Sequence, residues 1–244
     1  MRVPAFAPAL DEVTDVIRLV SAAPRVAVVP GWHLEIRDEQ WRIAVNGCED
    51  ARSAGHQVLV GAGVAVEHLV VALEARDHRV EVRVLPSDDL HAAATIGVVG
   101  RRRTSPVQLA LHRAASCGPP PTARAVRPSD LRVLNLTAEA LSTEVMWSSQ
   151  VSADLVLRGQ QRLHPAQDAP PFATIVTHGD TPLDWVRAGR ALARLFLRAT
   201  VLGLDVHQEL QSLSQEATRA QLQELWGLST VPQAQFSLTS PATR

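Results

Sequence analysis

The sequence of 244 residues predicts a mixed α+β fold, and three observations support this prediction. Two neighbouring segments alternate between apolar and polar residues, which is typical of a β-hairpin. Two long stretches carry apolar residues at helical spacing, and each runs into a turn. These two stretches also echo each other at one constant offset, because Gly63 and Ala65 superimpose on Gly189 and Ala191. A duplicated α+β half-domain explains this echo, and so does the shared composition of two apolar helices.

The first part of the chain is predicted to contain two helices and three strands. An amphipathic helix over residues 10–22 ends before Pro24. Residues 32–36 and 41–45 form the expected hairpin, because both runs alternate between apolar and polar residues. Each run begins with a tryptophan. Residues 56–76 form a helix rich in Val and Ala, and the run VEVRVL over 80–85 forms the strand after it.

The middle of the chain is predicted to connect two halves. The pattern loosens between residues 101 and 128, and the run CGPPP over 117–121 stops any helix. We therefore expect half-domains over 1–115 and 129–244, joined by this Pro/Gly-rich connection within a single domain. Residues 129–147 are expected to be helical, and residues 151–158 fit neither pattern clearly.

The second part contains the best-specified element of the sequence. After a short buried strand over 173–177, Thr181 is a capping residue, Pro182 fits the first helical position, and Asp184 fits the third. The helix continues to about residue 202 and ends at Gly203. A last helix over 216–226 and a strand over 231–238 follow.

Composition excludes several kinds of chemistry. All 24 basic residues are Arg, and the chain contains no Lys and no Tyr, so lysine-based phosphate loops, Schiff bases and tyrosine acids are impossible. Two cysteines favour a reducing cytoplasm over a disulfide framework. The net charge of -1 does not predict nucleic-acid binding. The longest apolar run is interrupted by Glu67 and His68, so no membrane span is predicted.

No catalytic constellation and no metal site are predicted. His178 and Asp180 lie close together in sequence, but no G-x-S-x-G motif supplies a nucleophile. We interpret Asp180 and Thr181 as part of the helix cap. The nine histidines form neither an H-E-x-x-H motif nor a Cys/His cluster, so we expect no metal.

Four arginines mark the most informative surface. Steps of three, four and four place them on one face of the 182–202 helix, opposite its apolar stripe. Such a row is either a solvated face paired with carboxylates from elsewhere, or a platform for a phosphate or an acidic partner. We call this row the arginine face, and its members are Arg187, Arg190, Arg194 and Arg198.

Three stretches resemble the Acg-type branch of the nitroreductase-like flavoproteins. Residues 56–86 resemble the central helix and following strand of that family, residues 184–204 resemble its "WLRAGQALERVLLEATALGL" helix, and residues 222–244 resemble its closing segment. The resemblance implies an antiparallel sheet flanked by helices, in two fused half-domains of which the second is reduced. It also implies FMN as cofactor, with NAD(P)H-dependent reduction as the activity.

The cofactor loop of the branch, "APSVHNTQPW", is degraded here to APRVAVVPGW over 23–32. Arg25 replaces its Ser, while Trp32 is kept. By the same resemblance His68 stands for an Asn of the central helix, and Arg244 is the remnant of a "PRRP" tail. The expected cofactor-binding residues are therefore Arg25, Trp32, His68, Arg187, Arg190, Arg194 and Arg244.

Two functions follow from the resemblance and its departures. The first is FMN-dependent NAD(P)H oxidoreduction, in which the flavin carries the reaction and no catalytic side chain is required. The alternative is a non-catalytic relative that sequesters flavin, or that binds an anionic ligand or an acidic partner through the arginine face. The chain is expected to be a monomer or a homodimer in either case.

Overall fold

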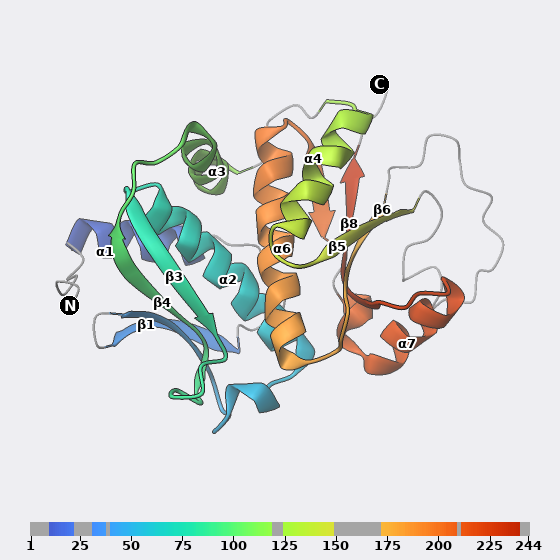
Figure 1. Cartoon of the computed structure of the whole chain (residues 1–244), viewed down its shortest axis with the longest axis horizontal. Helices are drawn as coiled ribbons and strands as arrows, with labels where there is room; N and C mark the ends of the chain where they lie inside the picture. Colours follow the sequence, from blue (N-terminus) through green and yellow to red (C-terminus); the bar gives the residue numbers. More distant parts are fainter. Residues whose placement is uncertain are drawn as a thin grey trace.

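The computed structural model describes residues 10–21, 31–37, 40–118, 124–148, 172–208 and 211–239. Within these ranges the fold is α+β, with six α-helices and two four-stranded antiparallel sheets (Figure 1). The two sheets lie on opposite sides of a central pair of helices, α2 and α6. This agrees with the predicted fold class.

The first unit runs from α1 to β4. Its first two strands coincide with the two alternating runs that predicted a hairpin. The β1–β2 register pairs Trp32 with Val45 and Ile36 with Trp41. The strand order is β1-β2-β4-β3. The elements are α1 Leu10–Ser21, β1 Trp32–Arg37, β2 Gln40–Val45, α2 His56–Glu74, β3 His78–Val84 and β4 Ala92–Arg101, with a short 3-10 turn Ala51–Ser53 before α2.

The second unit runs from α4 to β8, and α3 (Pro106–Cys117) lies between the two units in sequence. Its strand order β5-β6-β8-β7 repeats that of the first unit, strand for strand. Its elements are α4 Pro128–Glu139, β5 Glu144–Ser148, β6 Phe172–Thr177, α6 Pro182–Val201, β7 Asp205–Gln208, the 3-10 turn Gln211–Ser214, α7 Glu216–Leu225 and β8 Val231–Thr239.

The repeat extends to the register of the central strands. In β2 the residue Ile43 pairs with Ala94, and the ladder shifts directly after it. In β6 the residue Ile175 pairs with Ala234, and the ladder shifts at the same place. A shared irregularity of this kind is a specific feature, because a bulge re-aims the strand that carries it. Each sheet therefore has a register shift at the same position of its second strand.

The helices α2 and α6 cross at two glycines that match in the sequence echo. A Cβ added to Gly63 would lie 2.2 Å from the carbonyl oxygen of Val186, and one added to Gly189 would lie 2.0 Å from that of Val60. The two Cα atoms approach so closely that no side chain fits between the helices. The echo therefore places one equivalent glycine of each unit at the crossing point.

Both hydrophobic cores extend through this crossing. The first core, between α1, α2 and the first sheet, includes Val186 of α6. The second core, between α4, α6 and the second sheet, includes Val60 and Val64 of α2. Helix α2 is long and apolar enough to cross a membrane, but 89% of its most apolar window is buried inside the fold. It is the central core helix of this structure.

Several predicted boundaries are corrected. The helix over 129–147 is wrong in its second part, because α4 ends at Glu139, Ser142 adopts a φ of 57°, and β5 begins at Glu144. Strands β4 and β7 and helix α3 were not predicted. β4 is rich in Ala and Gly, which disfavour strands, and pairing on both of its edges overrides that preference. Residues 119–121 and 151–158 lie outside the described ranges.

Candidate functional site

Two of the predicted cofactor residues outside α6, Trp32 and His68, lie within the described residues and occupy separate places. Arg25 and Arg244 lie outside the described residues. Trp32 packs partly buried against the first core. His68 is 3% exposed, and its ring Nδ1 lies 2.9 Å from the backbone oxygen of Val64, one turn earlier in α2. Burial is the main reason that the pKa of His68 is lowered, so this ring is a neutral core group.

The arginine face is organised by a carboxylate of the opposite helix. Glu67 of α2 is fully buried, and its two oxygens accept hydrogen bonds from Arg190 and Arg194 of α6. The Arg190 Nε lies 3.0 Å from Glu67 Oε2. The side chains of Arg190 and Arg194 are 18% and 20% exposed, respectively. One carboxylate thus holds two guanidinium groups whose outer edges still reach solvent.

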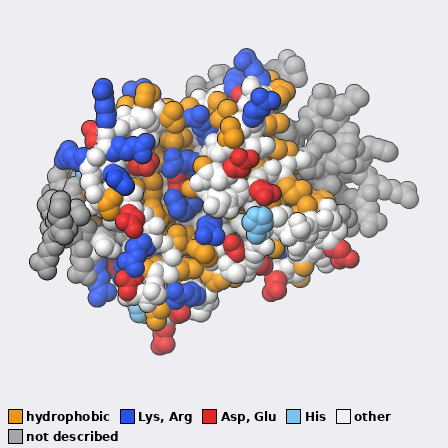
Figure 2. All heavy atoms as spheres, in the orientation of Figure 1, with side chains coloured by type: hydrophobic (Ala, Val, Ile, Leu, Met, Phe, Trp, Pro, Cys, Tyr) orange, Lys and Arg blue, Asp and Glu red, His pale blue; other side chains and the backbone are white. Residues whose placement is uncertain are grey.

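The two ends of the arginine face are more loosely held. Arg187 lies 3.9 Å from Asp184 one turn earlier, and its side chain is 42% exposed. Arg198 is half-buried near the end of α6, and no ion pair joins it to an acid in the part of the chain that the structure describes. Figure 2 shows blue arginine side chains down the middle of the visible side of the molecule, along the border of the two units.

The charges along the arginine face do not balance. Among the described residues, the four guanidinium groups share two carboxylates: Glu67, which is buried, and Asp184, which lies 3.9 Å from Arg187. Within these residues, pairing with acids of other elements therefore holds for Arg190 and Arg194 only. Excess positive charge along a fixed row of donors attracts oxyanions, because guanidinium edges match the geometry of carboxylates and phosphates.

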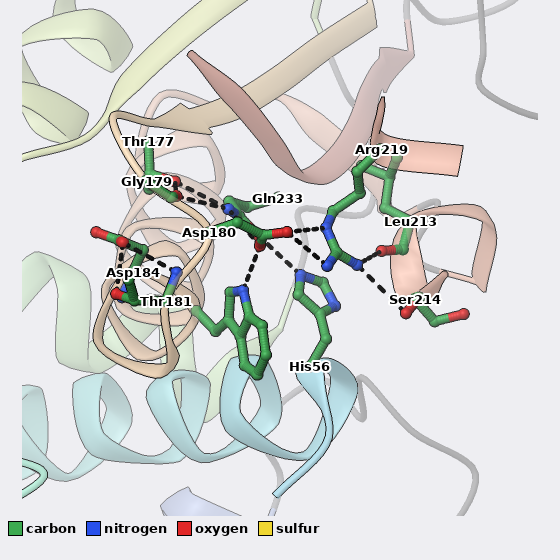
Figure 3. A network of polar contacts seen from close by, with 11 residues as sticks. His56, Thr177, Gly179, Asp180, Thr181, Asp184, Leu213, Ser214, Arg219 and Gln233 are labelled. Carbon is green, nitrogen blue, oxygen red and sulfur yellow. Dashed lines mark hydrogen bonds and ion pairs between the residues drawn. The ribbon is translucent and has the colours of Figure 1, made fainter. Parts of the chain in front are cut away.

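A second polar cluster surrounds Asp180 at the start of α6 (Figure 3). Arg219 of α7 donates from its NH2 group to Asp180 Oδ2 at 2.8 Å, and the indole of Trp185 donates to Oδ1. Burial alone would raise the pKa of Asp180, but the hydrogen bonds from Arg219 and Trp185 outweigh burial and lower it. Arg219 is 3% exposed and also donates to the carbonyl oxygens of Leu213 and Ser214.

The cluster reaches across to the first unit through His56, the first residue of α2. Its Nε2 lies 2.9 Å from Oε1 of Gln233 in β8, and Gln233 donates onward to Thr177 Oγ1 and to the Gly179 oxygen. Burial first, and then the charge of Arg219, lower the pKa of His56 to about 4. The ring is therefore neutral at pH 7, with Nε2 as the donor to Gln233. Its Nδ1 is buried and has no hydrogen-bond partner within the described ranges.

This cluster corrects one sequence interpretation. Thr181 caps α6 as predicted, with Asp184 completing a capping box. Asp180 is not part of the cap, because both of its oxygens are used by the cluster. Sequence reasoning missed Arg219 and Gln233, since they come from α7 and β8 and no local pattern links them to residue 180. The cluster joins the start of α6 to α7, β8 and the first residue of α2.

No protein-family model matches the chain, and no curated protein matches it either. The function is therefore inferred from the geometry above, with the resemblance of residues 56–86, 184–204 and 222–244 as an expectation only.

Proposed function

We propose that the protein binds a phosphate-bearing ligand along the arginine face of α6, with flavin mononucleotide as the first ligand to test. The observation that carries this proposal is the pair of guanidinium groups held by one buried carboxylate. Glu67 fixes Arg190 and Arg194 in place while leaving a net positive charge at the solvent edge. Arginines fixed in advance lose little side-chain freedom when an oxyanion binds.

The position of the arginine face also supports the proposal. It lies at the border of the two units, where α6 is flanked by α2 and α3 on one side and by α4 on the other (Figure 1). Ligand sites are common at borders of this kind, because two packed bodies leave a concave seam. A phosphate there would face the outer edges of the Arg190 and Arg194 guanidinium groups, and Arg187 and Arg198 would add positive charge from the two ends of the row, about 16 Å apart along the helix.

The flavin ring has weaker support than its phosphate. Of the expected cofactor-binding residues outside α6, the structure describes two: Trp32 packs against the first core and the His68 ring is hydrogen-bonded within its own helix. Bound FMN would supply hydride transfer from NAD(P)H, and in this proposal the arginines of α6 hold its phosphate. We expect this function to operate in the cytoplasm.

The test compares ligands that differ only in phosphate. We expect FMN to bind the purified protein in a fluorescence titration and riboflavin, which lacks the phosphate, to bind at least about tenfold more weakly. Affinity for FMN should fall with added salt, because the arginine face is partly exposed. Equal affinities for FMN and riboflavin would contradict the proposal. Binding of inorganic phosphate or NADPH without FMN would keep the anion site and exclude the flavin.

Variants at the ends of the row separate binding from folding. The double variant Arg187→Gln/Arg198→Gln leaves the Glu67 pair intact and should weaken FMN binding about tenfold or more. Arg79→Gln on β3, which removes an exposed arginine from the first sheet, is the matched control and should bind as the parent protein does. Tight binding of an acidic protein with no affinity for any phosphate would replace this proposal with the partner-binding alternative.

A further inference from the structure

A separate cavity of about 310 Å³ lies over the first sheet, away from the arginine face. Its lining is polar and charged, and it contains neither an aromatic ring nor an aliphatic side chain among the residues described. Such a lining does not suit a flavin or a nucleobase, which require apolar or stacking contacts. Its lining includes Arg42, Arg83, Asp88, Asp89 and Thr95.

Three of these residues form one row across the sheet. Thr95 of β4 pairs with Arg42 of β2 on one side and with Arg83 of β3 on the other. Residues in direct register share a face of the sheet, so the hydroxyl of Thr95 is flanked by two guanidinium side chains. The opposite face of these strands is the core, with Ile43, Ala94 and Ile96.

The two arginines of the row differ in mobility. Arg42 is 7% exposed and is held by ion pairs to both Glu35 and Asp89. Arg83 is 46% exposed and pairs with Asp88, itself 63% exposed, at 2.8 Å. An exposed pair of this kind contributes little free energy and exchanges readily with other partners. The mouth of the cavity therefore has one positive and one negative group that are able to separate.

The hydroxyl at the centre of the row makes no hydrogen bond to any residue that the structure describes. Thr95 is 7% exposed, and its Oγ1 is buried. The equivalent row of the second sheet is closed, because Thr174 of β6 pairs in register with Gln235 of β8 and accepts a hydrogen bond from its side-chain amide at 2.9 Å. The two matching rows thus differ, and of these two described pairs only the one under the cavity contains a hydroxyl without a hydrogen bond.

We propose that this cavity binds a small zwitterion, such as a free α-amino acid. Once the Arg83–Asp88 pair separates, the ligand carboxylate would accept from Arg83 and from the Thr95 hydroxyl, and the ligand ammonium would pair with Asp88. Overall charge favours a zwitterion over an anion, since among the described residues the three arginines of the lining are matched in number by Asp88, Asp89 and the Glu35 partner of Arg42. A bare phosphate would find no excess positive charge here.

The test uses glycine, L-serine and L-glutamate as probes, with acetate and methylammonium as ligands that each carry one charged end. Amide chemical shifts of β4 residues report binding at the cavity by NMR. We expect at least one amino acid to saturate these shifts at about 10 mM or below, with acetate and methylammonium at least about tenfold weaker. The proposal is overturned if no amino acid saturates in that range, or if acetate alone binds equally well.

Variants identify the residues that bind. Arg83→Gln and Asp88→Asn should each weaken amino-acid binding at least about tenfold, because each removes one charged end of the site. Thr95→Val should weaken it similarly while raising the midpoint of thermal unfolding, since the unpaired hydroxyl is gone. Unchanged affinity in all three variants, or a lower midpoint in Thr95→Val, would overturn the proposal.

The second sheet provides the matched control. Thr174→Val makes the same chemical change in the matching row, where Thr174 takes the place of Arg42 and Gln235 that of Thr95. It should lower the unfolding midpoint by breaking the bond from Gln235 while leaving amino-acid binding unchanged. The double variant Arg187→Gln/Arg198→Gln should also keep amino-acid binding. Failure of the phosphate site and failure of this cavity are therefore distinguishable.

Discussion

At the scale of single residues, two side chains of α2 tie the units together by polar contacts. Glu67 holds two arginines of α6 near the middle of the helix pair, and His56 bonds to Gln233 of β8 at its beginning. Both groups are buried, so each would be costly without its partner. Apolar packing allows some sliding between helices, whereas these directional contacts fix one arrangement.

Acid should weaken the fold through His56. Its folded pKa of about 4 lies below the ordinary 6.5 of an unfolded chain, so the unfolded state takes up a proton first. The stabilisation is complete above pH 6.5, declines as the pH falls from 6.5 to 4, and is gone below 4. The difference between these two pKa values corresponds to a loss of roughly 3 kcal/mol in the free energy of unfolding.

Urea denaturation at several pH values measures this loss. The variant His56→Gln has no titrating ring and should lose about 3 kcal/mol less than the parent between pH 6.5 and 4. The buried His68, whose pKa is also lowered, is present in both proteins and serves as the internal control. Parallel pH profiles of the parent and the variant would show that His56 does not titrate in this range.

At the scale of elements, α6 combines three surfaces on one helix. Its apolar stripe packs into the second core, Gly189 meets α2, and the arginine face turns toward the border of the units. A capping box with Pro182 at the first turn fixes where the helix begins. A shift of this start by one residue would rotate all three surfaces by about 100°.

Alanine at either crossing glycine should destabilise the protein. In an ordinary helix Gly→Ala is favourable by about 1 kcal/mol, but here the new Cβ would lie 2.2 Å or 2.0 Å from a backbone oxygen. Backbone cannot yield as a flexible side chain does, so the helices must separate. We expect Gly63→Ala and Gly189→Ala each to cost about 2–3 kcal/mol in chemical denaturation.

Gly97→Ala in β4 is the control for the crossing glycines, since a Cβ there meets nothing within 4 Å. That variant should be neutral or slightly stabilising. If Gly63→Ala proved as harmless as Gly97→Ala, the close approach of α2 and α6 would be refuted.

At the scale of the whole molecule, the two units cannot unfold independently. Each core contains residues from the central helix of the other unit, namely Val186 in the first and Val60 and Val64 in the second. Loss of either unit would expose these side chains and the buried Glu67 together. The molecule therefore behaves as one cooperative body built from a structural repeat.

Calorimetry tests this cooperativity. We expect a single thermal transition with equal calorimetric and van't Hoff enthalpies. Ile43 and Ile175 occupy equivalent positions in β2 and β6. The matched variants Ile43→Ala and Ile175→Ala should each lower the midpoint temperature of that one transition, because each lowers the free energy of unfolding by about 2–5 kcal/mol. Two separated transitions, with each variant moving only one of them, would show that the units are independent.

The sequence determined the elements whose signals are local. The caps of α6, the alternation of β1 and β2 and the apolar period of α2 are written in neighbouring residues, so all four were predicted near their observed bounds. The echo of Gly63 and Gly189 was also visible, as was the helical spacing of the arginine face.

Only the tertiary structure decided what these features contact. The sequence did not place Glu67 between Arg190 and Arg194, nor Gln233 against His56, because these partners are more than a hundred residues apart and follow no local period. β4 likewise depends on its two neighbours, since its Ala and Gly residues have little strand preference of their own. Local conformational preferences determine where the helices and strands form. Contacts buried between segments far apart in the sequence determine which side chains meet at the sites.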